Sequence, residues 1–135
     1  MDINVVTVVP FAIKDVYEAM RDHMPALAQY MPNVDSIVVE SRDETDDGVV
    51  SLVNRWNAAA TEVPVMARSF IDPASIYWLD RAEWTNETYS CRWALEMGFM
   101  AERVKCTGST LYAAVAEDRT EMRIAGELSL DLKGM

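Results

Sequence analysis

The sequence is poor in several residue types on which whole classes of protein depend. Its 135 residues include one histidine and two cysteines, which are too few for a disulfide scaffold and have no metal-ligand spacing. A catalytic triad would have to use His23, but this residue lies at an expected helix end, where a surface or capping role fits better. The five glycines show no phosphate-loop spacing. We therefore expect no metal and no cofactor.

Basic residues and long apolar runs are also scarce. The sequence has 12 Lys and Arg against 22 Asp and Glu, which gives a net charge of −10. The basic surface that binding to nucleic acid or anionic lipid requires is therefore missing. No apolar run approaches the roughly 18 residues of a membrane-spanning helix. The N-terminus has no basic region or cleavage site of a secretory signal. We expect a cytoplasmic protein that binds no nucleic acid and does not insert stably into membranes.

What is present predicts one domain over residues 1–135 with an α+β fold. Residues 2–9 are rich in β-branched side chains and indicate a strand that ends at Pro10. Apolar residues at helical spacing follow, and Pro25 is expected to divide them into two short helices. A small helix is predicted around residues 65–70. The remaining strands, about seven with the first, are expected at residues 34–42, 48–57, 75–84, 89–97, 103–115 and 120–132.

Side-chain alternation assigns the two faces of this antiparallel sheet. Trp78, Trp84 and Trp93 fall on one apolar face. The opposite face carries Arg81, Glu83, Arg92 and Glu96, which can pair across strands. Two tryptophans on one short strand exceed what a thin core usually needs, and they would suit the wall of a cavity.

The dipeptide at residues 98 and 99 predicts the centre of a tight hairpin. If Gly98 has the positive φ of a type II′ turn, Trp93 pairs with Val104 and Cys91 pairs with Cys106. The two cysteines would then be reduced cross-strand neighbours. A longer or asymmetric loop would shift the register and separate them.

A strand, a proline, a helix pair and six antiparallel strands resemble the START-like, helix-grip (SRPBCC) superfamily, which includes birch-pollen allergens and polyketide cyclase and coenzyme Q-binding domains. The resemblance is carried by "VVPFAIKDVYEAMRDH", "IYWLDRAEW" and "CTGSTLYAAV…EMRIAGELSLDLKG", and it spans nearly the whole chain without a catalytic motif. It implies a curved sheet that holds an apolar ligand against a C-terminal helix. This sequence ends where that helix is expected to begin.

By this resemblance the concave face is a ligand-binding cavity, and without it a plain core is the simpler interpretation. Asp80 would lie either buried with a raised pKa or in water near a strand end. Arg68 is the cation expected at the cavity mouth, and no residue is assigned as catalytic. The candidate ligand-binding residues are Asn54, Trp56, Met66, Phe70, Trp78, Asp80, Trp84, Trp93, Met97 and Tyr112.

Three functions fit these residues. The first is binding of a small hydrophobic or amphipathic molecule, such as a lipid, a polyketide or an isoprenoid-like compound. The second is a cyclase or dehydratase in which Asp80, Tyr112 or Arg68 assists proton transfer. The third is an interaction module that dimerises through its concave face. Because an uncovered apolar sheet face is rare on a stable monomer, we expect a homodimer or a truncated form of a longer protein.

Overall fold

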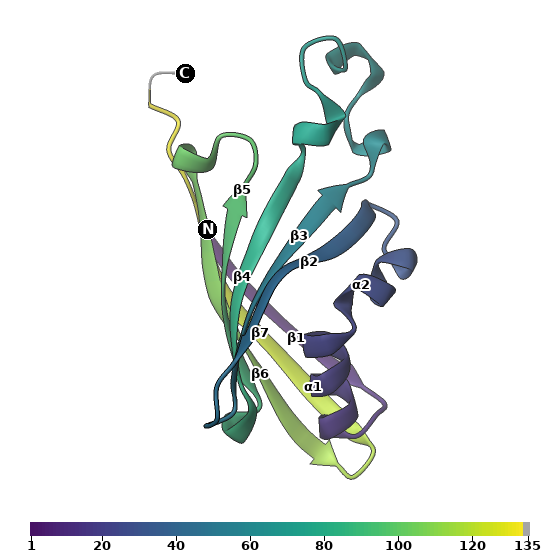
Figure 1. Cartoon of the computed structure of the whole chain (residues 1–135), viewed down its shortest axis with the longest axis vertical. Helices are drawn as coiled ribbons and strands as arrows, with labels where there is room; N and C mark the ends of the chain where they lie inside the picture. Colours follow the sequence, from purple (N-terminus) through teal and green to yellow (C-terminus); the bar gives the residue numbers. More distant parts are fainter. Residues whose placement is uncertain (134–135) are drawn as a thin grey trace.

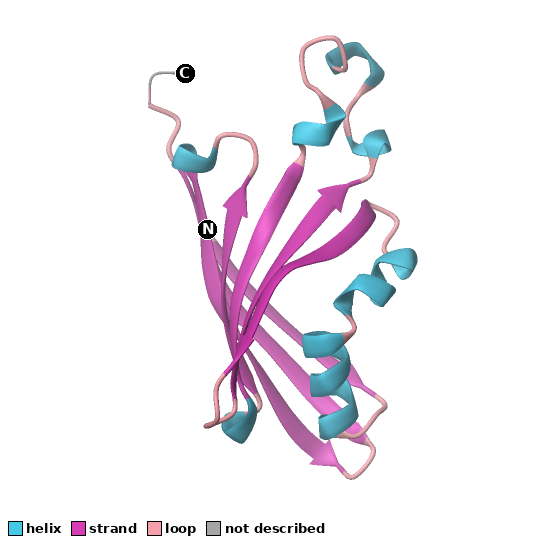
Figure 2. Ribbon diagram, in the orientation of Figure 1, coloured by secondary structure: helices cyan, strands magenta, loops and turns pink. Residues whose placement is uncertain are grey.

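The structure is a computed structural model that describes residues 1–133 (Figures 1 and 2). Two short helices, α1 (Ile13–Asp22) and α2 (Met24–Leu27), connect the first two strands. The strands are β1 (Asp2–Val9), β2 (Val34–Glu44), β3 (Val49–Ala58), β4 (Tyr77–Thr85), β5 (Ser90–Met97), β6 (Val104–Ala116) and β7 (Arg119–Leu130). This is the predicted α+β order. None of the helices in residues 1–133 is long and apolar enough to span a membrane.

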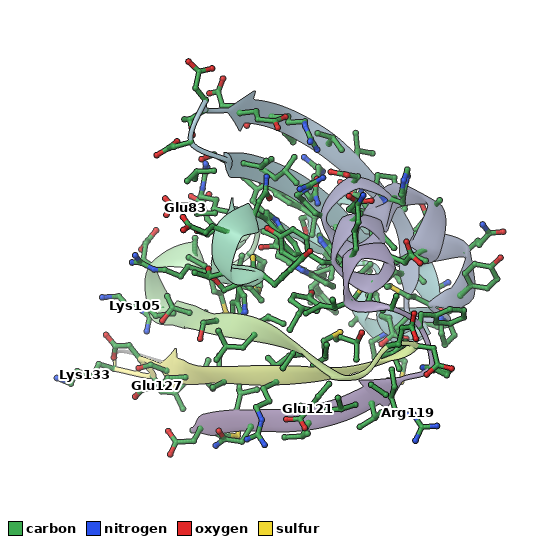
Figure 3. The ribbon with its side chains drawn as sticks, turned by 90° about the horizontal axis from the view of Figure 1, so that it is seen from below. Glu83, Lys105, Arg119, Glu121, Glu127 and Lys133 are labelled. Atoms are coloured by element: carbon green, nitrogen blue, oxygen red, sulfur yellow. The ribbon has the colours of Figure 1, made fainter. Side chains whose placement is uncertain are left out.

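All seven strands form one antiparallel sheet in the order β1-β7-β6-β5-β4-β3-β2. The connection through α1 and α2 carries the chain from one edge of the sheet to the other. Figure 3 shows the sheet curving so that β1 and β2 lie on opposite sides of α1. We call the face towards α1 the inner face and its reverse the outer face.

Local sequence explains the helix pair. Pro10 ends β1, and α1 has Asp15 in its first turn and Arg21 in its last, which suits the helix dipole. His23 is the C-terminal cap of α1, as predicted, and its amide donates to the Ala19 carbonyl. Pro25 lies in the first turn of α2, where its missing amide hydrogen costs nothing.

One side chain attaches α1 to the inner face. Tyr17 is only 1% exposed, and its ring packs edge-on against Trp84, Tyr89 and Tyr112 at centroid distances of 5.4, 5.1 and 5.6 Å. Its hydroxyl donates to Asn86 Oδ1 at 2.9 Å, in the turn after β4. Burial raises the pKa of Tyr17 to about 12. The core around it comprises Val16, Val50, Leu52, Ala82, Trp84, Cys91 and Tyr112.

The predicted division into two faces is confirmed. Trp84 packs against Tyr17, and β-pairing places Trp93 opposite Ala82 and Trp78 opposite Met97 on the same face. Arg81, Glu83, Arg92 and Glu96 are exposed on the outer face. There the Arg81 guanidinium pairs with the Glu96 carboxylate at 2.9 Å. Figure 3 shows Glu83 and Lys105 on the side of the sheet away from α1.

The predicted hairpin at residues 98 and 99 is wrong. Residues 98–103 separate β5 from β6, and Met100, not Gly98, has a positive φ, of 59°. Glycine is needed at position 98 for space, because a Cβ there would lie 2.5 Å from Tyr77 Cδ1. The longer loop shifts the register by four residues.

The two cysteines are therefore not cross-strand neighbours. Cys91 faces Thr110, Cys106 faces Leu95, and both thiols are free and buried. The helix expected at residues 65–70 is likewise shorter. Residues 59–76 form a loop with three single 3-10 turns, at Ala60–Glu62, Val65–Ala67 and Pro73–Ser75. Pro64 is the residue that precedes the Val65–Ala67 turn.

Two glycines allow an indole to lie flat across β6 and β7. A Cβ on Gly108 would approach Trp93 Cζ2 to 2.5 Å and meet the Ala125 carbonyl, and one on Gly126 would lie 2.9 Å from Trp93 Cη2. The Trp93 indole N–H donates to Thr110 Oγ1 at 3.2 Å. The absence of side chains at these positions thus shapes the floor of the inner face.

We predict that Gly108→Ala lowers the free energy of unfolding by about 2–3 kcal/mol, because the methyl group overpacks against both a ring and backbone. Urea unfolding measures this loss. Ser109→Ala, one residue along the strand, is the control and is expected to cost less than about 1 kcal/mol. Equal losses in the two variants would contradict the close approach at Gly108.

Candidate functional site

Beyond the reach of Tyr17, two rows of side chains cross the inner face towards the 59–76 loop. The first row runs Ile37, Trp56, Trp78 and Met97, and the second runs Val39, Asn54, Asp80, Leu95, Cys106 and Leu128. We call these the upper rows. Of the two helices, α1 contacts β6 and β7, and α2 contacts β2, the strand that contributes Ile37 and Val39 to these rows (Figure 1).

Three polar atoms in the upper rows are buried without a hydrogen-bond partner. They are Asn54 Oδ1, Asp80 Oδ1 and Trp56 Nε1. Asn54 and Asp80 are directly opposed on β3 and β4, and Trp56 lies two residues from Asn54 on the same side of β3. We call these residues the polar trio. Buried polar groups are nearly always paired, so three orphans in one place need an explanation.

Asp80 has the most unusual environment of the trio. Burial, with no cation beside it, raises the pKa of its carboxyl to about 6. The arginines that adjoin Asp80 and Asn54 in the sequence have other partners. Arg81 pairs with Glu96 on the outer face, and Arg55 stacks on the Tyr77 ring at 3.8 Å.

The apolar part of the upper rows is a pair of stacked indoles. The ring centroids of Trp56 and Trp78 lie 5.7 Å apart at an interplanar angle of 23°. Both tryptophans are half-buried and Met97 adjoins them on β5. A planar apolar surface beside partnerless polar atoms is what a small-molecule site needs, since apolar contact supplies affinity and a few polar groups orient the ligand.

Comparison with known proteins identifies the architecture. No protein-family model and no curated protein matches the sequence. The solved structure of the Zhui aromatase/cyclase from a Streptomyces species has a TM-score of 0.72 at 12% identity, over 99% of this chain and 70% of that chain. This chain has the START-like, helix-grip fold. The predicted resemblance is confirmed at the level of fold.

Two further solved structures show the same START-like fold. A START superfamily protein from Mycobacterium smegmatis has a TM-score of 0.61 at 10% identity, over 99% of this chain and 80% of that chain. Norcoclaurine synthase from Thalictrum flavum has a TM-score of 0.60 at 13% identity, over 98% and 71%. Identities this low carry the fold and not the residues of a site.

Within the START-like fold, the ten candidate residues fall into three groups. Asn54, Trp56, Trp78, Asp80 and Met97 meet in the upper rows, with Trp93 in the next row. Trp84 and Tyr112 belong to the core under Tyr17. Met66 and Phe70 are 89% and 87% exposed in the 59–76 loop and do not pack with the tryptophans.

The expected role of Arg68 at a cavity mouth has a structural alternative. Its guanidinium donates to the Val63 and Ala60 carbonyls at 3.1 and 3.2 Å, which ties the loop to itself. Ile37 and Leu95 flank the polar trio in the upper rows, although neither was among the residues predicted for the site. Alternation along β2 and β5 predicts that these two side chains share the inner face. It does not show that they lie next to the polar trio until the strand register is known.

A hollow of about 740 Å³ lies on the outer face, away from the polar trio. Its lining includes Ser41, Asp43, Arg81, Glu83 and Arg92. These side chains are exposed, Arg81 pairs with Glu96, and none of their polar atoms is both buried and unpaired among the described residues. Unmet hydrogen-bonding capacity is a stronger sign of a ligand site than volume, so we place the candidate site on the inner face.

We predict that Asp80→Asn stabilises the protein at pH 7.5 by on the order of 2 kcal/mol and has little effect near pH 4. The folded-state pKa of about 6 exceeds the ordinary value, so the folded state binds more protons between roughly pH 4 and 6. Ionisation of Asp80 therefore weakens the fold as the pH rises through 6, and asparagine removes this penalty.

Urea unfolding at the two pH values measures the difference. Asp35→Asn is the matched control, because Asp35 is exposed on β2, and it is expected to change stability little at either pH. An equal effect of Asp80→Asn at pH 4 and pH 7.5 would show that Asp80 is well solvated in the folded protein.

Proposed function

We propose that this protein binds a small apolar or amphipathic molecule on the inner face of its sheet, over the upper rows. The observation that carries the proposal is the polar trio, whose three orphaned atoms adjoin the stacked Trp56 and Trp78 rings. A ligand with a polar group would satisfy the orphans and cover the half-buried indoles at once. A lipid, a polyketide or an isoprenoid-like compound has this amphipathic character.

Proteins of similar architecture support this class of function. The neighbours include an aromatase/cyclase, a START superfamily protein and norcoclaurine synthase. Ligand binding or cyclisation in general is consistent with all three. The choice of ligand rests on this chain's own residues.

An enzymatic role of the cyclase or dehydratase kind is the second candidate, and Asp80 favours it. A carboxyl whose pKa is raised to about 6 and that lacks a partner can accept and return a proton near neutral pH. Tyr112 is less suited to this role, because burial raises its pKa and its ring is packed in the core. Arg68 is bonded to loop carbonyls. Asp80 is thus the candidate general base.

A second copy of the chain is the alternative occupant of the inner face. Apolar residues along β7, such as Ile124 and Leu128, are only partly buried, and a two-fold dimer would cover them.

The cytoplasm is the compartment we propose, since both free thiols fit a reducing environment.

Native mass spectrometry of the purified protein, together with titration by the uncharged probe N-phenyl-1-naphthylamine, tests the binding proposal. We expect one probe molecule to bind per chain with micromolar affinity. Trp56→Ala with Trp78→Ala should weaken binding about tenfold or more, because the stacked apolar surface is lost. Arg92→Ala on the outer face should leave the affinity unchanged. A dimer that excludes the probe would favour self-association instead.

A further inference from the structure

The polar trio also restricts the chemistry of the ligand, and this inference rests on the proposed function. Asn54 Oδ1 and Asp80 Oδ1 are hydrogen-bond acceptors, whereas Trp56 Nε1 is a donor. A group that fits all three must donate at least one hydrogen and accept another. A hydroxyl does both. An ether oxygen only accepts, and an ammonium group only donates, so each leaves part of the trio unsatisfied.

Charge further restricts which ligand group can bind at the polar trio. On the strands beside Asp80, the facing residues are Asn54 on β3 and Leu95 on β5, and neither is charged. Cys91 and Tyr112 are the titratable groups that interact with Asp80, and burial raises the pKa of each, so both stay neutral. The arginines nearby in the sequence have other partners. Arg55 stacks on the Tyr77 ring, and Arg68 donates to the Val63 carbonyl. Arg81 pairs with Glu96.

An anionic ligand group would therefore meet a carboxylate and two uncharged residues without a cation to balance it. At short range in a partly buried site, such repulsion lowers the affinity for an anion by about tenfold or more. The adjoining surface is the Trp56–Trp78 pair, whose rings are near-parallel at 23°. A flat aromatic ligand can extend this stack with offset geometry, whereas a branched aliphatic one cannot.

We propose that the polar trio of Asn54, Trp56 and Asp80 is a head-group subsite for the uncharged hydroxyl of an aromatic ligand, and that it discriminates against carboxylates. The single hydroxyl hydrogen is shared between the acceptors Asp80 Oδ1 and Asn54 Oδ1 in one bifurcated hydrogen bond, and the Trp56 indole N–H donates to the hydroxyl oxygen. The ring of the ligand lies against Trp56 and Trp78.

Equilibrium dialysis of the full chain against three probes tests this at pH 7.5. The probes share one ring system: 2-naphthol donates and accepts, 2-methoxynaphthalene only accepts, and 2-naphthoate is an anion. We expect 2-naphthol to bind at least tenfold more tightly than either of the others, because only it satisfies the trio.

Two variants assign the discrimination to Asp80. Asp80→Leu should reduce the preference for 2-naphthol over 2-methoxynaphthalene to within about twofold. Asp80→Asn keeps the shape and removes the charge, so its affinity for 2-naphthoate should rise about tenfold. Asp80→Asn also provides the test of this residue if the Asp80→Leu variant does not fold. Glu83→Gln changes the charge on the outer face of the same strand, and it should preserve the wild-type order.

The outcomes separate the two proposals. Equal affinity of the wild type for all three probes would overturn the head-group subsite and leave ligand binding intact. A wild-type preference that survives both Asp80 variants would overturn the assignment to this residue. Absence of binding by any probe and by N-phenyl-1-naphthylamine would overturn both proposals.

Discussion

The insertion of Tyr17 between three aromatic rings decides which part of the sheet is closed. Edge-on contacts with Trp84, Tyr89 and Tyr112 fix its ring, and the bond to Asn86 fixes its hydroxyl. Arg21, one turn later on α1, donates to the same Asn86 oxygen at 2.8 Å. With two side chains held by one turn of the sheet, α1 stays over the lower part of the inner face. The upper rows lie beyond the reach of these contacts.

Two aspartates show how differently this fold treats its charges. Asp22, at the end of α1, is bonded by Arg21 and Arg42, and the Arg21 hydrogen bond is the main reason that its pKa falls to about 2. Asp80 has no such partner, and burial raises its pKa to about 6. The first arrangement strengthens the fold at neutral pH, and the second weakens it. A destabilising buried carboxyl is retained more readily where it serves binding or proton transfer than where it only fills the core.

Much of this architecture could be predicted from the sequence. Strong alternation in β4 and β5 gave the two faces, and Pro10 and Pro25 gave the limits of the helices. The hairpin after β5 could not be placed, because the sequence does not show that Tyr77 occupies the space beside Gly98. The predicted partner of Cys91 on β6 was therefore Cys106, four residues away from its actual partner Thr110. The register of a hairpin depends on the length of its loop.

The candidate site was only partly predictable, because it too depends on how the strands pair. Trp56, Trp78 and Asp80 were found by type and alternation, but their adjacency to Asn54 follows from pairing between strands. Met66 and Phe70 were grouped with them by apolar character alone. The 59–76 loop instead holds them in solvent, since its short 3-10 turns do not fold back onto the sheet.

The four tryptophan side chains provide the most direct test of ligand binding on the upper rows. Their indole resonances can be observed in an ¹H–¹⁵N correlation spectrum and assigned with single Trp→Phe variants. On addition of N-phenyl-1-naphthylamine, the Trp56 and Trp78 indoles are expected to shift most, while Trp84, which is buried beneath Tyr17, keeps its position. A spectrum in which Trp84 shifts most, or in which Trp56 and Trp78 do not move, would contradict a ligand site on the upper rows.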